Sequence, residues 1–298
     1  PSRLPLHIQG EVDKRFERVK DVFTRNFNDG WERGGASLAV YEHGRKVVDL
    51  WGGYADASAM RKWKEDTIQV TFSTTKGVAA ICVAMLVDRG YLSYDDLVIK
   101  HWPEFGQHGK DNVTVEMLLS HQAGLVYFDE DLTVDDIRDH SVMSKKFEEQ
   151  KPHWPPGTAT GYHAYTYGWL VDQVIRRADP YHRSIGQFVR EELHDKYSID
   201  FHIGLPSQHA SRVARLTAPS FIDRVSEILT DLRLAGQYRT LLELLKPNSL
   251  FSRALANLPF FEMIRQMTVN NPDYWQIEQA AALGMGNARS LAQIFNLV

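Results

Sequence analysis

The sequence has little of what disulfide-stabilised, membrane-spanning and nucleic-acid-binding proteins need. Its 298 residues include a single cysteine, Cys82, so no disulfide can form within the chain, and an intracellular location is favoured. No apolar run reaches the ~18 residues of a membrane-spanning helix. The net charge is −4 and the basic residues are scattered, so we expect no nucleic-acid partner.

Several catalytic and metal-binding patterns are also absent. The 12 histidines form no His-x-x-x-His pair and have no cysteine partner, so we expect no metal site. The sequence has no G-x-S-x-G elbow, the nucleophile motif of α/β-hydrolases. It also has no glycine pattern of the Walker or dinucleotide-binding type, so we expect no cofactor. Cys82 lies in the apolar run VAAICVAMLV, which favours a buried, inert thiol over a catalytic thiolate.

What is present is the pattern of a folded α+β protein. At 43% hydrophobic and 24% charged residues, the composition excludes disordered and fibrous classes. Apolar spacings predict a helix over 11–28, then strands at 37–41 and 46–51 that flank His43-Gly44 as a hairpin. From Ile68 the chain is predicted to be extended as far as Phe72, and then helical until Gly90.

The rest of the chain is predicted to be mostly helical. The charged stretch 129–151 is expected to be exposed, and no further convincing strand is found to extend the hairpin. A helix, an antiparallel hairpin and a long helical part indicate the α+β class rather than alternating βαβ units. Further helices are predicted at 114–120, from about 166, at 184–194, at 220–245 and from about 288.

One short motif places a serine and a lysine together at the head of an apolar helix. Ser73 and Lys76 are three positions apart and lie on one helix face. A serine hydroxyl needs a base, and a lysine can serve when burial at a helix N-terminus lowers the pKa of its amine. Alone, the pattern indicates only a capping serine and a surface lysine. Its place after an extended segment favours the catalytic alternative.

A tyrosine forms the second candidate feature, in PPGTATGYHAYTYGWL at 155–170. Tyr162 follows the turn at Pro156-Gly157 and precedes a predicted helix. A tyrosine held near a lysine can act as a phenolate base or a proton relay. Aromatic residues crowd this segment, so a packing role for Tyr162 stays open.

Five ordered stretches together resemble the serine β-lactamase-like family, which includes class C β-lactamases, DD-peptidases and related esterases. The resemblance runs along nearly the whole chain, and its closest match is to the β-lactamase-related proteins of esterase type. The stretches are VVDLWGG (47–53), FSTTKG (72–77), VEMLLSHQAGL (115–125), Pro156-Gly157 with Tyr162, and NARSLA (287–292).

The resemblance implies a β-lactamase/DD-peptidase-like fold, with an antiparallel sheet flanked by helices and a mostly helical lobe. It implies one domain over 1–298, with 1–72 in the α/β part and 73–298 in the helical lobe. Ser73 would be the acylated nucleophile, Lys76 its base partner and Tyr162 the proton carrier. The Ser73 N–H would be one oxyanion donor. The implied reaction is hydrolysis of a small ester or amide through an acyl-enzyme, without metal or cofactor.

Two departures from the family pattern refine this expectation. Tyr162-His163-Ala164 stands where the family often has Tyr-x-Asn, so the amide that would contact a β-lactam is missing and an esterase is favoured. The late Lys-Thr-Gly or His-x-Gly motif is not found. We therefore expect a domain truncated at its C-terminus, without its last strands and second oxyanion donor. A β-lactamase or D-Ala peptidase stays open, as does a non-catalytic binding or assembly protein of this fold.

Overall fold

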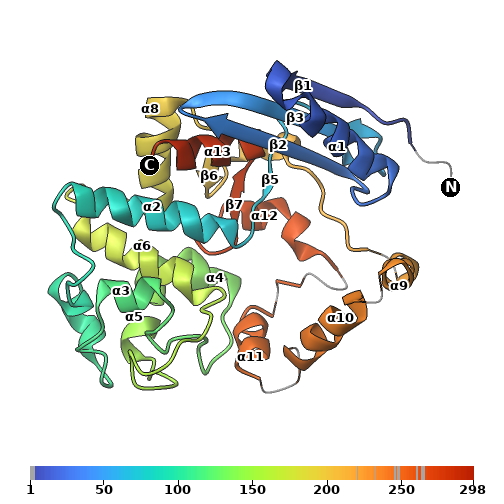
Figure 1. Cartoon of the computed structure of the whole chain (residues 1–298). Coiled ribbons are helices and arrows are strands. Elements are labelled where there is room, and N and C mark those ends of the chain that lie inside the picture. The colour runs from blue at the N-terminus through green and yellow to red at the C-terminus, as the bar shows by residue number, and fades with distance from the viewer. Residues whose placement is uncertain are drawn as a thin grey trace. The chain divides into compact units, whose positions relative to one another are not determined.

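Segments that are far apart in the sequence come together in each of two structural units. The computed structural model describes residues 4–219, 221–231, 233–244, 246, 249–259, 261–262 and 266–298. Figure 1 shows the course of the chain through its helices and strands. The first unit consists of Pro1–Thr71, Gly186–Arg215 and Gly284–Val298, and the second of Phe72–Ile185 and Leu216–Leu283.

An antiparallel sheet lies at the centre of the first unit, in the order β1-β3-β2, with β4 beside β3. The predicted hairpin is confirmed. His43 and Gly44 both have positive φ, at 50° and 79°, as a tight hairpin turn requires. The strands are β1 (Ile8–Val12), β2 (Gly35–Glu42), β3 (Arg45–Asp56) and β4 (Arg61–Lys62).

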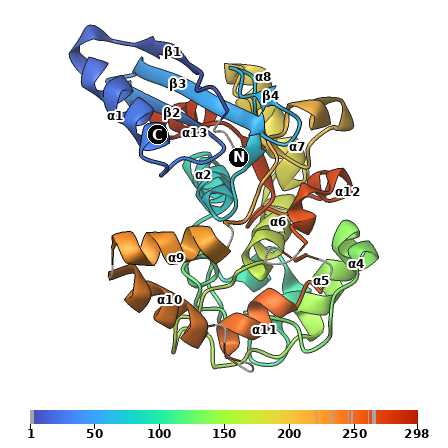
Figure 2. The ribbon, with the colours of Figure 1, turned by 90° about the vertical axis from the view of Figure 1, so that its right-hand side faces the viewer.

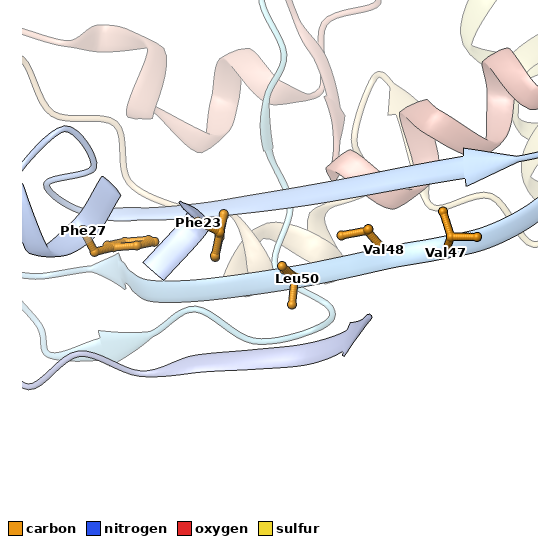
Figure 3. Packing of buried hydrophobic residues seen from close by; sticks show 5 residues of the cluster. All are labelled: Phe23, Phe27, Val47, Val48 and Leu50. Atoms are coloured by element: carbon orange, nitrogen blue, oxygen red, sulfur yellow. The ribbon is translucent and has the colours of Figure 1, made fainter. Parts of the chain in front are cut away.

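One face of this sheet packs against α1 (Glu17–Asn28). Phe23 and Phe27 of this helix form a buried cluster with Val47, Val48 and Leu50 of β3, and Figure 3 shows these five side chains. The cluster is the hydrophobic core of this part of the unit, because burying such apolar surface is the main force that holds a helix on a sheet.

The opposite face of the sheet is covered by α13 (Ala288–Asn296), which runs beside β2 in Figure 1. Successive residues of a strand point to opposite faces, so Asp49 faces away from its neighbours Val48 and Leu50. Its carboxylate accepts from the Arg289 guanidinium at 2.9 Å, and the Ser37 hydroxyl oxygen accepts from the Ala288 N–H at 3.4 Å. The sheet is therefore enclosed between two helices that come from the two ends of the chain.

A second, smaller sheet has the order β5-β7-β6, with both pairs antiparallel. It joins three short segments that are at least 81 positions apart in the sequence, since β6 ends at Ile203 and β7 begins at Gly284. The chain continues from β5 to Ser73 within three residues. Its strands are β5 (Gln69–Val70), β6 (Phe201–Ile203) and β7 (Gly284–Gly286). The helical elements before β6 are α7 (Ile185–Val189), whose first residue belongs to the second unit, the π-helix Arg190–His194 and α8 (Asp195–Tyr197), and the 3-10 helix Ser207–Arg212 follows β6.

The second unit is mostly helical, and two helices form its centre. The helices α2 (Thr74–Asp88) and α6 (Thr166–Ala178) pack side by side in both Figure 1 and Figure 2. No helix in the described part of the chain has both the length and the apolarity to cross a membrane. The remaining helices are α3 (Val115–Leu119), α4 (Val134–Arg138), α5 (His140–Glu149), α9 (Phe221–Thr230), α10 (Arg233–Leu244), α11 (Leu250–Ala256) and α12 (Pro272–Trp275).

Most of the predicted helices are confirmed, and so is the α+β class. Thr114 caps α3 with its side chain, α2 ends just before Gly90, and Cys82 is buried as expected. The helix predicted over 220–245 is two helices, α9 and α10, in the described residues. Residues 220, 232 and 245 lie outside the described part.

Three predictions about the fold were wrong. The predicted helix at 11–28 begins only at Glu17, because Ile8–Val12 pairs with β3 as a strand. The hairpin does gain further strands, β1 and β4, and β6 and β7 form with β5 a sheet that was not foreseen. The charged stretch 129–151 is only partly exposed, since Ile137, Met143 and Phe147 are buried on the inner side of α4 and α5.

Truncating Leu50 to alanine tests the importance of the cluster between α1 and β3. Leu50 is fully buried, so Leu50→Ala is expected to lower the free energy of unfolding by about 2–5 kcal/mol through lost burial and a residual cavity. Val22→Ala on the exposed side of α1 is the matched control, because that side chain is 51% exposed. Urea unfolding measures both, and equal losses would contradict this description of the core.

Candidate active site

A sharp backbone turn places Ser73 at the start of α2. β5 ends at Val70, and Phe72 has a left-handed φ of 43°, which costs a residue with a Cβ about 1–2 kcal/mol. Thr75 stabilises the turn, because its N–H and its hydroxyl both donate to the Phe72 carbonyl, at 2.9 and 2.6 Å. Ser73 is the N-cap residue of α2, and the helix begins at Thr74.

The Ser73 hydroxyl does not cap the helix. No hydrogen bond joins it to the backbone N–H groups of the first turn, so the interpretation of Ser73 as a capping residue is wrong. Its Oγ lies 3.4 Å from the Lys76 Nζ and 2.6 Å from the Tyr162 phenolic oxygen. The structure thus brings all three sequence-predicted site residues into contact, and their catalytic roles remain predictions.

The Lys76 amine is buried between two backbone carbonyl groups. The side chain is 8% exposed, so the alternative of a surface lysine is wrong as well. Its Nζ donates to the carbonyls of Ala164 and Ala281, both at 2.9 Å. Burial disfavours the charged form and lowers the pKa of Lys76 to about 7.

The number of hydrogens on the amine matches this arrangement in either protonation state. An ammonium has three N–H groups, which donate to the two carbonyls and to Ser73 Oγ. A neutral amine has two N–H groups, which satisfy the carbonyls, and a lone pair that accepts the Ser73 O–H. Loss of one proton therefore leaves every partner of Lys76 satisfied and turns the serine into the donor.

The two carbonyls on Lys76 are held in place by Gln279, which is 1% exposed. Its side-chain amide donates to the Tyr165 carbonyl at 2.6 Å, next to Ala164. Its side-chain oxygen accepts from the N–H groups of Ala281 and Ala282, both at 2.8 Å. One buried glutamine therefore ties together the two peptide segments that supply the carbonyls.

A glycine on α6 permits this close approach. A Cβ at Gly168 would lie 2.5 Å from the backbone nitrogen of Ala281 and 2.8 Å from that of Ala280. Both distances are shorter than van der Waals contact, so any larger residue would displace the segment that carries the Ala281 carbonyl. The position of Lys76 thus depends on close packing as well as on hydrogen bonds.

Tyr162 contacts both other predicted site residues. Its hydroxyl donates to Ser73 Oγ, and its ring centroid lies 4.7 Å from the Lys76 Nζ, within cation–π range. The side chain is 42% exposed, so solvent reaches it, unlike the amine. The phenol and the exposed Ser73 can therefore meet bound water or a ligand, whereas the buried amine cannot.

Two histidines flank the cluster, and both are held neutral by burial. Burial lowers the pKa of His121 and that of His163 to about 4 each. The fully buried His163 donates from Nδ1 to the Gly161 carbonyl at 2.6 Å and accepts at Nε2 from the Leu125 N–H at 3.0 Å. Both ring nitrogens of His163 are therefore engaged by backbone groups.

Sequence reasoning missed the residues that surround the lysine. Gln279 lies in no recognised motif, and Gly168 lies in the stretch 155–170 without an assigned role. The contacts of Ala164 and Ala281 come from backbone atoms that any residue would supply. His121 lies inside the stretch VEMLLSHQAGL, which was a signal without an assigned role. In the described part of the chain, no group of three or more His, Cys, Asp and Glu side chains is placed to hold a metal ion.

Relatives with known structures share this architecture. A family VIII carboxylesterase is 35% identical, with a TM-score of 0.81 over 97% of this chain and 70% of that chain. A penicillin-binding protein homologue from Caulobacter crescentus is also 35% identical, with a TM-score of 0.78 and the same coverage. The predicted β-lactamase/DD-peptidase-like fold is therefore confirmed.

Sequence comparisons agree with the structural ones. The Esterase/beta-lactamase LipL of Mycobacterium tuberculosis (strain ATCC 25618 / H37Rv) is 32% identical over 293 residues, which are 98% of this chain. The chain spans 64% of the length of that relative. The family model for Beta-lactamase matches residues 23–298, and with this match over most of its length the chain belongs to the Beta-lactamase family.

Proposed function

We propose that the protein is a serine hydrolase that cleaves small esters through an acyl-enzyme on Ser73. The observation that carries the proposal is the position of Ser73 Oγ between the Lys76 amine, at 3.4 Å, and the Tyr162 phenol, at 2.6 Å. The pKa of about 7 makes Lys76 a usable base near neutral pH. The names of LipL and of the carboxylesterase support the same reaction class.

In the proposed acylation step, neutral Lys76 removes the Ser73 hydroxyl proton while Oγ attacks the carbonyl carbon of the ester. The carbonyl oxygen becomes negative, and the Ser73 backbone N–H can donate to it, because none of the described residues accepts from this N–H. The ester C–O bond then breaks, and Tyr162 passes its proton to the leaving alkoxide. The resulting phenolate then takes up the proton held by the neighbouring Lys76 ammonium, whose Nζ lies 4.7 Å from the Tyr162 ring centroid.

In the deacylation step, water attacks the acyl carbon and gives its proton to the Lys76–Tyr162 pair. The bond between the acyl carbon and Oγ breaks, the carboxylic acid leaves, and Ser73 recovers its hydrogen. The exposure of Tyr162 supports its role in this exchange, since a phenol that solvent reaches can contact the incoming water. Only the two steps together return the three side chains to their starting protonation.

The surroundings of Tyr162 favour an ester over a β-lactam substrate. His163 is fully buried and both of its ring nitrogens are engaged, so it cannot replace the asparagine amide of the Tyr-x-Asn pattern. Ala164 is 6% exposed and has no polar side chain to offer. The amide side chain of a β-lactam antibiotic would therefore find no hydrogen-bond partner at either position.

A fluorophosphonate probe is expected to label Ser73 covalently, because its phosphorus is attacked by an activated serine hydroxyl. Ser73→Ala should abolish labelling, whereas Ser141→Ala, at the exposed start of α5, should leave it unchanged. Mass spectrometry of the digested adduct locates the modified residue. A folded sample without any adduct would support the alternative of a non-catalytic binding protein.

The rate of Ser73 labelling should rise with pH, with a midpoint at about 7. Only the neutral amine can accept the serine proton, so activity increases as Lys76 loses its charge. The pKa values of about 4 keep His121 and His163 neutral throughout this range. Lys76→Arg should remove the pH-dependent rate, because an arginine stays charged. A rate that is constant from pH 5.5 to 8.5 would argue against a lysine base.

Replacing Tyr162 by phenylalanine should keep the ring and remove only the proton carrier. We expect ester turnover to fall by about 10²–10⁴-fold, the usual contribution of general acid–base catalysis.

Wild-type protein should hydrolyse short p-nitrophenyl esters faster than nitrocefin or D-Ala peptides. Faster turnover of nitrocefin would instead favour the β-lactamase alternative, and unchanged ester turnover in Tyr162→Phe would exclude the phenol from proton transfer.

A further inference from the structure

His121 makes both polar contacts that bracket Tyr162 along the chain. Its backbone carbonyl accepts from the Gly161 N–H at 3.1 Å, and its Nδ1 accepts from the His163 N–H at 3.2 Å. Gly161 and His163 are the two sequence neighbours of Tyr162. A single residue from the turn after α3 therefore holds the backbone on either side of the phenol.

The imidazole ring also packs on the phenol itself. The ring centroids of His121 and Tyr162 are 4.9 Å apart, with an interplanar angle of 54°. The ring centroid of Tyr167, on α6, lies 5.1 Å from that of His121. Packing between aromatic rings restricts the rotation of a half-exposed side chain. This packing holds the Tyr162 hydroxyl in the orientation in which it donates to Ser73 Oγ, and keeps it from rotating into solvent.

The backbone of His121 is left-handed at the position from which it makes these contacts. Its φ of 63° lies in the left-handed region. Few residues with a Cβ adopt this region, although histidine does so more often than most of them. The strained conformation coincides with the use of both the carbonyl and the imidazole on one neighbouring segment. Strain of this kind persists where the surroundings determine the conformation.

The protonation state of the imidazole is consistent with an accepting Nδ1. The titratable groups around it are Lys76, Tyr162, His163 and Tyr167. Burial and the positive charge of Lys76 lower the pKa of His121 to about 4, so its ring is neutral wherever the proposed reaction runs. His121 therefore holds the tyrosine without exchanging protons itself.

We propose that His121 is the positioning residue that fixes the Tyr162 phenol on the Ser73 hydroxyl. The proposal rests on the acyl-transfer function proposed above. It gives a role to the stretch VEMLLSHQAGL, which sequence reasoning had left unexplained.

Two substitutions separate the side chain from the backbone conformation. His121→Gly removes the ring and the Nδ1 acceptor while relieving the left-handed strain, so the fold should survive. His121→Asn keeps an acceptor at the Nδ1 position and tolerates a positive φ. The matched control is His108→Gly, because His108 also has a left-handed φ, of 57°, and is exposed.

The kinetics of short alkyl-ester hydrolysis should rank the variants, because an alkoxide leaving group needs the Tyr162 proton whereas the fluoride of a fluorophosphonate leaves without one. We expect His121→Gly to lower kcat by about 100-fold, as displacement of a proton carrier by about 1 Å does, with little change in KM. The kcat of His121→Asn should be about tenfold higher than that of His121→Gly, and the midpoint near pH 7 should stay in both variants because Lys76 is untouched. His108→Gly should match the wild type. A wild-type kcat in His121→Gly, or no recovery in His121→Asn, would overturn the proposal.

A second measurement tests the positioning even if the wild type proves unreactive. In spectra of protein with ¹³C-labelled tyrosine rings, Tyr162→Phe identifies the Tyr162 signal. This signal should be distinct in the wild type and shift toward the free-tyrosine position in His121→Gly. An unchanged signal would refute the positioning role. Absence of Ser73 labelling in the wild type would refute the proposed function instead.

Discussion

The burial of one amine is the constraint on which the candidate site depends. Lys76 lies at the head of an apolar helix, where its charge is disfavoured both by desolvation and by the positive end of the helix dipole. Two carbonyl oxygens and a serine hydroxyl are the acceptors around its Nζ. This is enough to satisfy the amine in either form, yet burial holds its pKa at about 7.

The residues around Lys76 and Tyr162 hold these two side chains in place. Gln279 joins the two segments that present the carbonyls, and Gly168 lets one of them lie directly on α6. His121 and His163 secure the tyrosine from the other side through neutral imidazoles. The hydrogen bonds of Gln279 and of His163 Nε2 are buried, so removing any one of them leaves another polar group unpaired.

Sequence reasoning succeeded where the information is local. The S-x-x-K spacing predicts a shared helix face, and the hairpin follows from two β-prone runs around His43-Gly44. It failed where pairing decides the structure: in Ile8–Val12 the apolar residues continue the helical spacing of the next segment, and only β3 makes it a strand. The strand Gly284–Gly286 has almost no β propensity and exists because β5 and β6 flank it.

The environment of the lysine could not be predicted for a different reason. Its partners include the backbone carbonyls of Ala164 and Ala281. Every residue has a backbone carbonyl, so the sequence cannot show which ones contact the lysine. The 129–151 stretch was misjudged because its many charges hide four buried apolar side chains, Leu132, Ile137, Met143 and Phe147. In both cases tertiary packing, rather than composition, decides which groups meet water.

The most direct test of the central claim is to titrate the amine itself. Lysine labelled with ¹³C at Cε reports the charge of each Nζ by its chemical shift, and Lys76→Arg assigns the Lys76 signal. Burial between two carbonyls predicts a Lys76 midpoint near pH 7, well below the usual pKa of a lysine. A midpoint above pH 10 would show that the amine keeps its charge in the folded protein, and the proposed base would not exist.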